Sequence, residues 1–352
     1  MKQPDFDGQI ALKGSPGSPY TRKMLAVLRY RRIPYRYLQT QIYAQYDLPA
    51  AKVALQPTFY WPGENGELEA VVDSTPIIRE LEAMYPGRAI VPNDSVMAFL
   101  DDLIEDYADE WLTKAMFHYR WHFDEDATQG GLMLPRWGSV TKQEAQISPM
   151  SDSIRDRQVN RLYVVGSNHT TAPVIEASYL RLLDILDAHI RNGPYVLGSR
   201  PSACDFGLYG QLTQLTHFDP TPMAICLERT PQVFAWVDVI ADLSGEFAAE
   251  DGWFARDALP ETLFPLLHEI GRVYVPALLA NSAAIETGAD TVQTTIDGQE
   301  WTQSPYPYQA RCLTWLRQAY ARLDEEDRRD VDSIIDGTGV EKLFLKPAQS
   351  TS

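Results

Sequence analysis

The segment at residues 14–23 (GSPGSPYTRK) places a hydroxyl group at the start of a predicted helix. Ser18 is of the type favoured at an N-cap, and Pro19 suits the first helical position. Free backbone N–H groups and the positive end of the helix dipole stabilise an anion at such a place. A thiolate held there would have a lowered pKa, because the hydroxyl donates to sulfur and the dipole favours the charge. The alternative is an ordinary N-cap that does no chemistry.

The energy required for thiol activation is within reach of this arrangement. A free thiol with a pKa of about 8.5 is only a few per cent ionised at pH 7. Lowering that pKa by about 2 units needs roughly 2.7 kcal/mol of differential stabilisation. One charge-assisted hydrogen bond together with a helix dipole can supply it.

Two further junctions carry groups suited to a peptide ligand. A cis bond at Gln56-Pro57 would turn the preceding backbone N–H and C=O outward, although a trans proline at a strand entrance is the alternative. At residues 73–76 (DSTP), Ser74 and free N–H groups would bind a carboxylate while Asp73 pairs with an amino group. Together these match the head of an α-amino acid, whereas simple helix capping is the alternative reading.

The elements that must position these groups follow from hydrophobic periodicity. Strands are predicted at 9–13 and 35–40 around a helix at 19–32, so the opening is βαβ. Two more strands and a helix follow, with an Asn65-Gly66 turn signal between the strands, at 58–61, 68–72 and about 76–85. Only the first crossover needs to be parallel. One small sheet with helices against it results.

From residue 95 the pattern becomes helical. A long helix is predicted over 95–123, and residues 125–152, which contain Gly130-Gly131, Pro135 and Pro149, are expected to be a loop or broken helices. Further helices are predicted, in order, at 153–166, 173–191, 202–217 and 231–243. No strand pattern intervenes, so this part is all-α.

The last hundred residues form a separate, mostly helical segment. Residues 257–284 and 307–323 have helical periodicity, and residues 291–303 are predicted to form a β-hairpin that turns at Asp297-Gly298.

The combination of these features resembles the glutathione S-transferase superfamily. The matching motifs are GSPGSPYTRK, Gln56-Pro57 and Asp73-Ser74, with PYVLGSRPSACDFGL at 194–208 and TPQVFAWVDVI at 230–240 downstream. The resemblance covers residues 9–92 well and 95–243 in outline. It implies an α/β thioredoxin-like glutathione-binding domain at 1–92 and an all-α domain at 95–249, followed by a mostly helical C-terminal extension at 250–352.

The resemblance also implies roles for individual residues. Ser18 would be the catalytic serine that donates to the glutathione thiolate, with Ser15 as an alternative in the same loop. Gln56 would offer its backbone to the cysteinyl part of glutathione, with Pro57 cis. The γ-glutamyl group would be held by Asp73 and Ser74, and Arg22 would support the loop electrostatically.

The activity implied is conjugation of glutathione to a small hydrophobic electrophile. The opening loop lacks the cysteine that glutathione-dependent thiol transfer usually needs, so serine chemistry is favoured. The alternative is a non-catalytic binding or scaffold protein of the same fold, because residues 124–170, which the resemblance does not cover, and the C-terminal extension add surface for partners.

The long helix carries candidate residues for a second-substrate pocket and for a metal site. Tyr107 and Trp111, with Tyr119, would border an electrophile pocket, or they would pack in the core. His118 and His122 have an i, i+4 spacing that can bind a metal, but no HExxH motif or third ligand accompanies them. We therefore expect glutathione as co-substrate and no metal.

Composition restricts the class of partner. The chain of 352 residues carries a net charge of −17, which argues against nucleic acid and anionic membrane surfaces. The three cysteines are far apart, so disulfides are not expected. The opening residues, MKQPDFDGQ, are unlike a signal peptide, so we expect a cytoplasmic protein. The family resemblance implies a homodimer.

Overall fold

The computed structural model describes residues 6–39, 46–63, 65–249 and 252–345, which divide into two compact units. Unit 1 contains the described residues of 1–90, 119–160 and 205–249, and unit 2 contains those of 91–118, 161–204 and 250–352. Each unit therefore draws on three stretches of sequence. The division at 1–92, 95–249 and 250–352 stays a prediction about the order of modules along the chain.

Unit 1 begins with the predicted small sheet. Its strands are β1 (Ile10–Lys13), β2 (Tyr35–Leu38), β3 (Thr58–Pro62) and β4 (Leu68–Val71), in the order β2-β1-β3-β4. Only the β1–β2 pair is parallel, as predicted, because only this pair is joined by a helical crossover. The predicted end of β2 at residue 40 lies outside the described residues.

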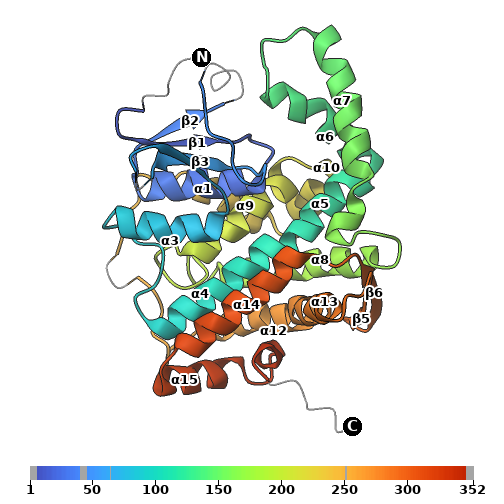
Figure 1. The fold of residues 1–352 in the computed structure, drawn as a ribbon. Coiled ribbons are helices and arrows are strands. Elements are labelled where there is room, and N and C mark those ends of the chain that lie inside the picture. Colours follow the sequence, from blue (N-terminus) through green and yellow to red (C-terminus); the bar gives the residue numbers. More distant parts are fainter. Residues whose placement is uncertain (1–5, 40–45, 64, 250–251, 346–352) are drawn as a thin grey trace. The chain divides into compact units, whose positions relative to one another are not determined.

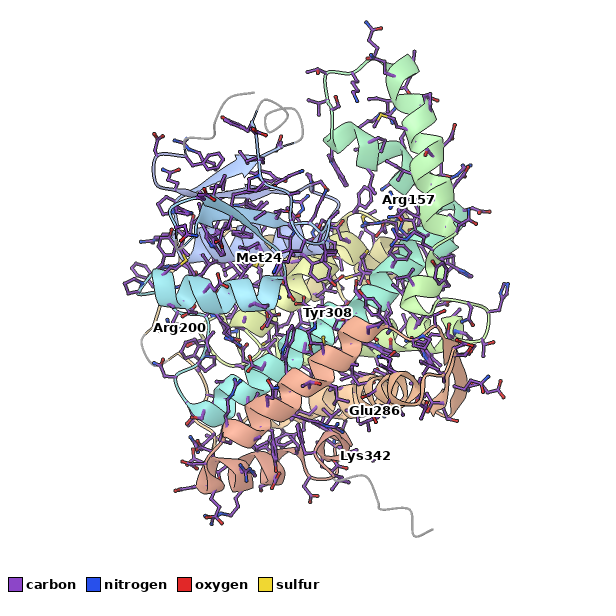
Figure 2. The ribbon with its side chains drawn as sticks, viewed as in Figure 1. Met24, Arg157, Arg200, Glu286, Tyr308 and Lys342 are labelled. Carbon is purple, nitrogen blue, oxygen red and sulfur yellow. The ribbon has the colours of Figure 1, made fainter. Side chains whose placement is uncertain are left out.

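Two helices lie on one side of this sheet, α1 (Pro19–Tyr30) and α3 (Ser74–Met84) (Figure 1). The apolar residues of α1 at helical spacing are buried, among them Met24, which Figure 2 labels. Burial of this stripe fixes how α1 lies against the strands, and so fixes where its first residue is presented.

The segment predicted as a loop or broken helices forms two regular helices, α6 (Asp124–Trp137) and α7 (Glu144–Val159), which run side by side in Figure 1. Pro135 and Pro149 lie inside these helices, so neither ends one. A Cβ at Gly130 would lie 3.0 Å from the Trp121 ring, and one at Gly131 would lie 3.0 Å from Arg155. The glycines thus allow close packing instead of interrupting the helix.

Three more helices complete unit 1: α9 (Ala203–His217), which belongs to this unit from Asp205 on, α10 (Pro220–Arg229) and α11 (Pro231–Ile240). The sequence predicted α9 and α11, but α10 was not recognised as a separate helix. The side chain of Asp126 on α6 accepts from the backbone N–H of Thr221 at 2.9 Å, which ties α6 to the start of α10.

Unit 2 is mostly helical. It contains α4 (Ser95–Tyr107), which continues through a π-helical turn (Ala108–Leu112) into α5 (Thr113–His122), whose residues from Tyr119 on belong to unit 1. The helix predicted over 95–123 is therefore confirmed. The other helices are α8 (Ala172–His189), α12 (Phe264–Glu269), α13 (Val275–Thr287), α14 (Pro307–Arg322) and α15 (Glu325–Ile335). Figure 1 shows α14 alongside α4.

The predicted hairpin in the C-terminal extension is present as β5 (Val292–Ile296) and β6 (Gln299–Gln303). Ile296 pairs with Gln299, which leaves a two-residue turn at Asp297 and Gly298. Their φ angles of 51° and 73° are both in the left-handed region that a type I′ turn requires.

Among the residues that the structure describes, one continuous helical stretch, Glu261–Thr287, is long and apolar enough by length and composition to cross a membrane. Its most apolar window is 61% buried inside the fold. The three cysteines are buried, and none of them forms a disulfide bond.

Candidate functional site

Ser18 occupies the predicted position at the start of α1. Its Oγ accepts a hydrogen bond from the backbone N–H of Thr21 at 3.2 Å, which makes Ser18 the N-cap. The same hydroxyl donates to the backbone O of Gln56 at 3.3 Å. The helix start and the segment before β3 therefore meet at one hydroxyl group.

Gln56 also receives the second serine of the loop. The hydroxyl of Ser15 donates to Gln56 Oε1 at 2.8 Å. The Gln56–Pro57 peptide bond is cis, as the family resemblance implies. Ser15 and Ser18, the two candidate thiol activators, thus both donate to Gln56, the residue expected to bind the cysteinyl group. Of the two, only Ser18 contacts the backbone of Gln56.

The second helix start is linked to α1 by a buried lysine. Lys23 Nζ donates to Ser74 Oγ at 3.1 Å, and both residues are buried. Asp73, the N-cap residue of α3, has a φ of 88°, a conformation in which non-glycine residues are rarely found. Ser18 caps α1 and Ser74 contacts a residue five positions along it, which corresponds to about 7.5 Å of helix.

The loop before Ser18 is held by an arginine that the sequence analysis did not identify. Arg120 Nη1 donates to Gly17 O at 3.0 Å, and Nη2 donates to Gln214 Oε1 at 2.8 Å. Its Nε lies 2.8 and 3.1 Å from the two carboxylate oxygens of Asp219. The side chains of Arg120 and Asp219 are 4% and 0% exposed, so this is a buried ion pair.

The carbonyl oxygen of Pro16 is anchored in the same way. It accepts from Arg22 Nε at 3.0 Å and from Gln214 Nε2 at 3.2 Å. Arg22 therefore supports the loop through a direct hydrogen bond. Burial raises the pKa of Asp219 to about 6, and the guanidinium of Arg120 opposes this rise.

A cavity of about 550 Å³ lies beside Gln56. Its lining includes Lys13 at the end of β1, Tyr60 on β3 and Leu55 just before Gln56. The volume falls in the range of roughly 300–1,000 Å³ that is usual for small-molecule sites. A ligand extended along the backbone of Gln56 would have room there.

The predicted second-substrate residues are core residues of unit 2. Trp111 is 1% exposed, its indole N–H donates to Ser178 Oγ at 3.1 Å, and its ring lies 5.3 Å from that of Trp301. Tyr107 is fully buried against Tyr274, with ring centroids 6.1 Å apart. The burial of both residues favours the core-packing alternative, and the role in a second-substrate pocket stays a prediction.

The structure gives a structural role to His118, one member of the candidate metal-binding pair His118 and His122. His118 is buried, with Nδ1 2.8 Å from Ser167 Oγ and Nε2 3.2 Å from Glu176 Oε1. Within the described ranges, no group of three or more His, Cys, Asp or Glu side chains is placed to hold a metal ion.

Two regions of the chain match models of known protein families. The model of the glutathione S-transferase N-terminal domain matches residues 12–89, and the model of the C-terminal domain matches residues 153–238. Both lie in the order that this superfamily requires, and the first includes Ser18, Gln56 and Ser74. The chain belongs to the glutathione S-transferase superfamily, and the fold class predicted from the sequence is confirmed.

Solved structures with a similar fold include three bacterial glutathione transferases. One from Pseudomonas fluorescens, with two glutathione bound, is 15% identical over 68% of this chain and 88% of its own, with a TM-score of 0.40. One from Methylobacterium radiotolerans, in complex with glutathione sulfonate, is 13% identical over 70% of this chain and 98% of its own, with a TM-score of 0.38. One from Pseudomonas putida, with glutathione disulfide bound, is 14% identical over 66% of this chain and 85% of its own, with a TM-score of 0.37. No curated protein matches the chain.

Proposed function

We propose that the protein is a glutathione transferase in which Ser18 activates the glutathione thiol for attack on a small hydrophobic electrophile. The observation that carries this proposal is the position of the Ser18 hydroxyl. It caps α1 and also donates to the backbone carbonyl of Gln56, the residue whose backbone would bind the cysteinyl group of glutathione. A sulfur atom placed there would meet a hydroxyl donor and the positive end of a helix together.

The rest of the tripeptide would extend in two directions from this point. Its γ-glutamyl head would lie at Asp73 and Ser74, where the start of α3 favours a carboxylate. Ser74 contacts Lys23 on α1, and an extended tripeptide spans about 10 Å, comparable with the spacing of residues 18 and 23 along the helix. The glycyl end would enter the cavity beside Gln56, into whose lining Lys13 brings a positive charge.

The chemistry needs one change of hydrogen-bond partner. In the structure the Ser18 hydroxyl donates to Gln56 O over a long 3.3 Å. When glutathione binds, its thiol releases a proton to solvent and the Ser18 O–H donates to the resulting thiolate. The sulfur then forms a carbon–sulfur bond with the electrophile, and the leaving group departs with the electron pair of the broken bond.

The protein would act as a soluble cytoplasmic homodimer, in keeping with the implied class. The alternative function is binding or scaffolding without catalysis. Gln56 favours it in one respect, since its side chain bonds Ser15 and occupies part of the space beside the loop.

The test compares Ser18→Ala with Ser15→Ala, using turnover of a generic aryl halide with glutathione. We expect turnover to fall at least about tenfold in Ser18→Ala, because one hydrogen bond to a charged group is lost. A large loss in Ser15→Ala with none in Ser18→Ala would transfer the role to Ser15. Retention on immobilised glutathione separates the alternatives, because a protein with a blocked site would not be held.

A further inference from the structure

A second cavity, of about 220 Å³, lies in unit 1 between the loop before Ser18 and helices α9 and α11. Pro16 and Arg22 contribute from the loop and α1, and Trp137 contributes from α6. None of Ser18, Gln56 and Ser74 lines it, so it is distinct from the glutathione site proposed above.

Two side chains that line this cavity have hydrogen-bond donors without a protein partner among the described residues. Arg22 donates a hydrogen bond from Nε to Pro16 O, and its Nη1 and Nη2 have no hydrogen-bond or ion-pair partner in the part of the chain that the structure describes. Tyr209 is 2% exposed, and its Oη likewise has no hydrogen-bond partner among those residues. Burial raises the pKa of Tyr209, so its phenol keeps the proton that it would donate. Both groups line the cavity, so a bound acceptor could pair with them without displacing a protein hydrogen bond.

The other polar groups of the lining are already committed. Gln214 Nε2 donates to Pro16 O and, at 2.8 Å, to Thr213 Oγ1, while Thr213 itself donates to Gly210 O. Asp238 lies 3.1 Å from His217 Nε2, which forms no hydrogen bond among the described residues. Of the groups that remain open, the guanidinium edge and the phenol together select an anion.

The remaining walls are apolar and aromatic. The rings of Trp137 and Phe218 lie 4.8 Å apart, and Val237 and Ala241 complete the lining from α11. At about 220 Å³ the cavity is smaller than the usual range for drug-sized ligands, which starts at roughly 300 Å³. A single aromatic ring bearing one acidic group matches this combination of size, walls and donors.

We propose that this cavity binds a small aromatic carboxylate. The carboxylate pairs with the open edge of Arg22 and accepts from Tyr209 Oη, and the ring lies against Trp137 and Phe218. Because Pro16 belongs both to this lining and to the loop that carries Ser18, the ligand would sit directly against the segment that positions the thiol site.

The test is calorimetric titration of the full-length protein with benzoate, and with acetate and benzyl alcohol as probes that each lack one feature. We expect benzoate to bind more tightly than either comparator. Affinity for benzoate should fall at least about tenfold in Arg22→Met and about two- to tenfold in Tyr209→Phe, from loss of a charged and a neutral hydrogen bond respectively. Arg36→Met is the matched control, because Arg36 is an exposed arginine paired with Asp7 and its loss changes the net charge equally.

Three results would each overturn the proposal. These are equal weakening by Arg36→Met, binding of acetate as tight as that of benzoate, and unchanged benzoate affinity in Tyr209→Phe. Tyr209→Phe keeps the shape of the side chain, so it decides the matter even if Arg22→Met fails to fold. The outcome is independent of the proposed transferase activity, because Ser18→Ala should bind benzoate as the unmodified protein does.

Discussion

Replacing Arg120 with methionine tests how the loop before Ser18 is held. Arg120→Met keeps a long side chain but removes the guanidinium that contacts Gly17, Gln214 and Asp219. Asp219 would then be a carboxylate with 0% exposure and no counter-charge. Breaking a buried pair in this way costs about 3–5 kcal/mol of unfolding free energy.

Protonation sets a ceiling on that cost. Without Arg120 the pKa of Asp219 would rise above its present value of about 6, and the carboxyl would become neutral at pH 7. Keeping a proton at pH 7 on a group with an unfolded pKa of about 3.9 costs roughly 4 kcal/mol relative to the unfolded state. The unmodified protein, in which the pKa of Asp219 is about 6, already carries roughly 3 kcal/mol of this cost, so protonation limits the loss at Asp219 itself to about 1 kcal/mol. At pH 5 Asp219 is largely neutral in both proteins, so the difference in stability should shrink by about 1 kcal/mol.

The double variant Arg120→Met/Asp219→Leu separates stability from loop positioning. Replacing both charges with apolar groups should restore most of the unfolding free energy, because no buried charge is left unpaired. The carbonyl of Gly17 would still lack its donor, so the affinity for glutathione should remain reduced.

The assay combines urea unfolding at pH 7 and pH 5 with calorimetric titration of glutathione, and Arg36→Met serves as a surface control. A double variant that regains both stability and full glutathione affinity would refute the positioning role and leave Arg120 as a purely structural residue.

Two further substitutions test packing and buried charge. Asp106 accepts from the hydroxyl of Tyr274 at 2.6 Å, and burial raises its pKa to about 7, so the stability that the protonated carboxyl contributes is lost as the pH rises from the unfolded pKa of about 3.9 to about 7. Asp106→Asn should therefore raise the melting temperature by roughly 2 °C or more at pH 9, by roughly half as much at pH 5.5, and little at pH 4. The control is Asp332→Asn, which removes an exposed carboxyl paired with Tyr320, and an equal response in both variants would contradict this reading. Gly17→Ala would place a Cβ 2.6 Å from the Trp137 ring and should lower the free energy of unfolding by about 1–3 kcal/mol. Gly17→Ala/Trp137→Phe should recover part of this stability, because the smaller ring leaves room for the Cβ. Unchanged thermal unfolding of Gly17→Ala would show that the loop shifts freely.

The features predicted correctly from the sequence depend on neighbouring residues. The start of α1 follows from Ser18 and Pro19, whose backbone preferences act within one turn of helix. The β5–β6 turn follows from Asp297-Gly298, because both positions need a positive φ. Such signals are read within a few residues, so tertiary structure had little scope to change them.

The features that were missed depend on contacts between distant parts of the chain. Arg120 lies more than a hundred residues from Gly17, and no local pattern marks it as a support of the loop. Arg120 lies among other polar residues of α5 and Asp219 lies just before α10, so their sequence surroundings do not single them out. Gly130 and Gly131 were read as helix breakers because the neighbours that need their small size, Trp121 and Arg155, become adjacent only after folding.

The pKa of the bound glutathione thiol tests the proposed role of Ser18 most directly. Ultraviolet absorption of the thiolate would be followed against pH in the unmodified protein and in Ser18→Ala, each saturated with glutathione. We predict a pKa about 2 units below the free value of about 8.5 in the unmodified protein, and a return toward the free value in Ser18→Ala. A bound thiol with the same pKa in both proteins would contradict the role of Ser18.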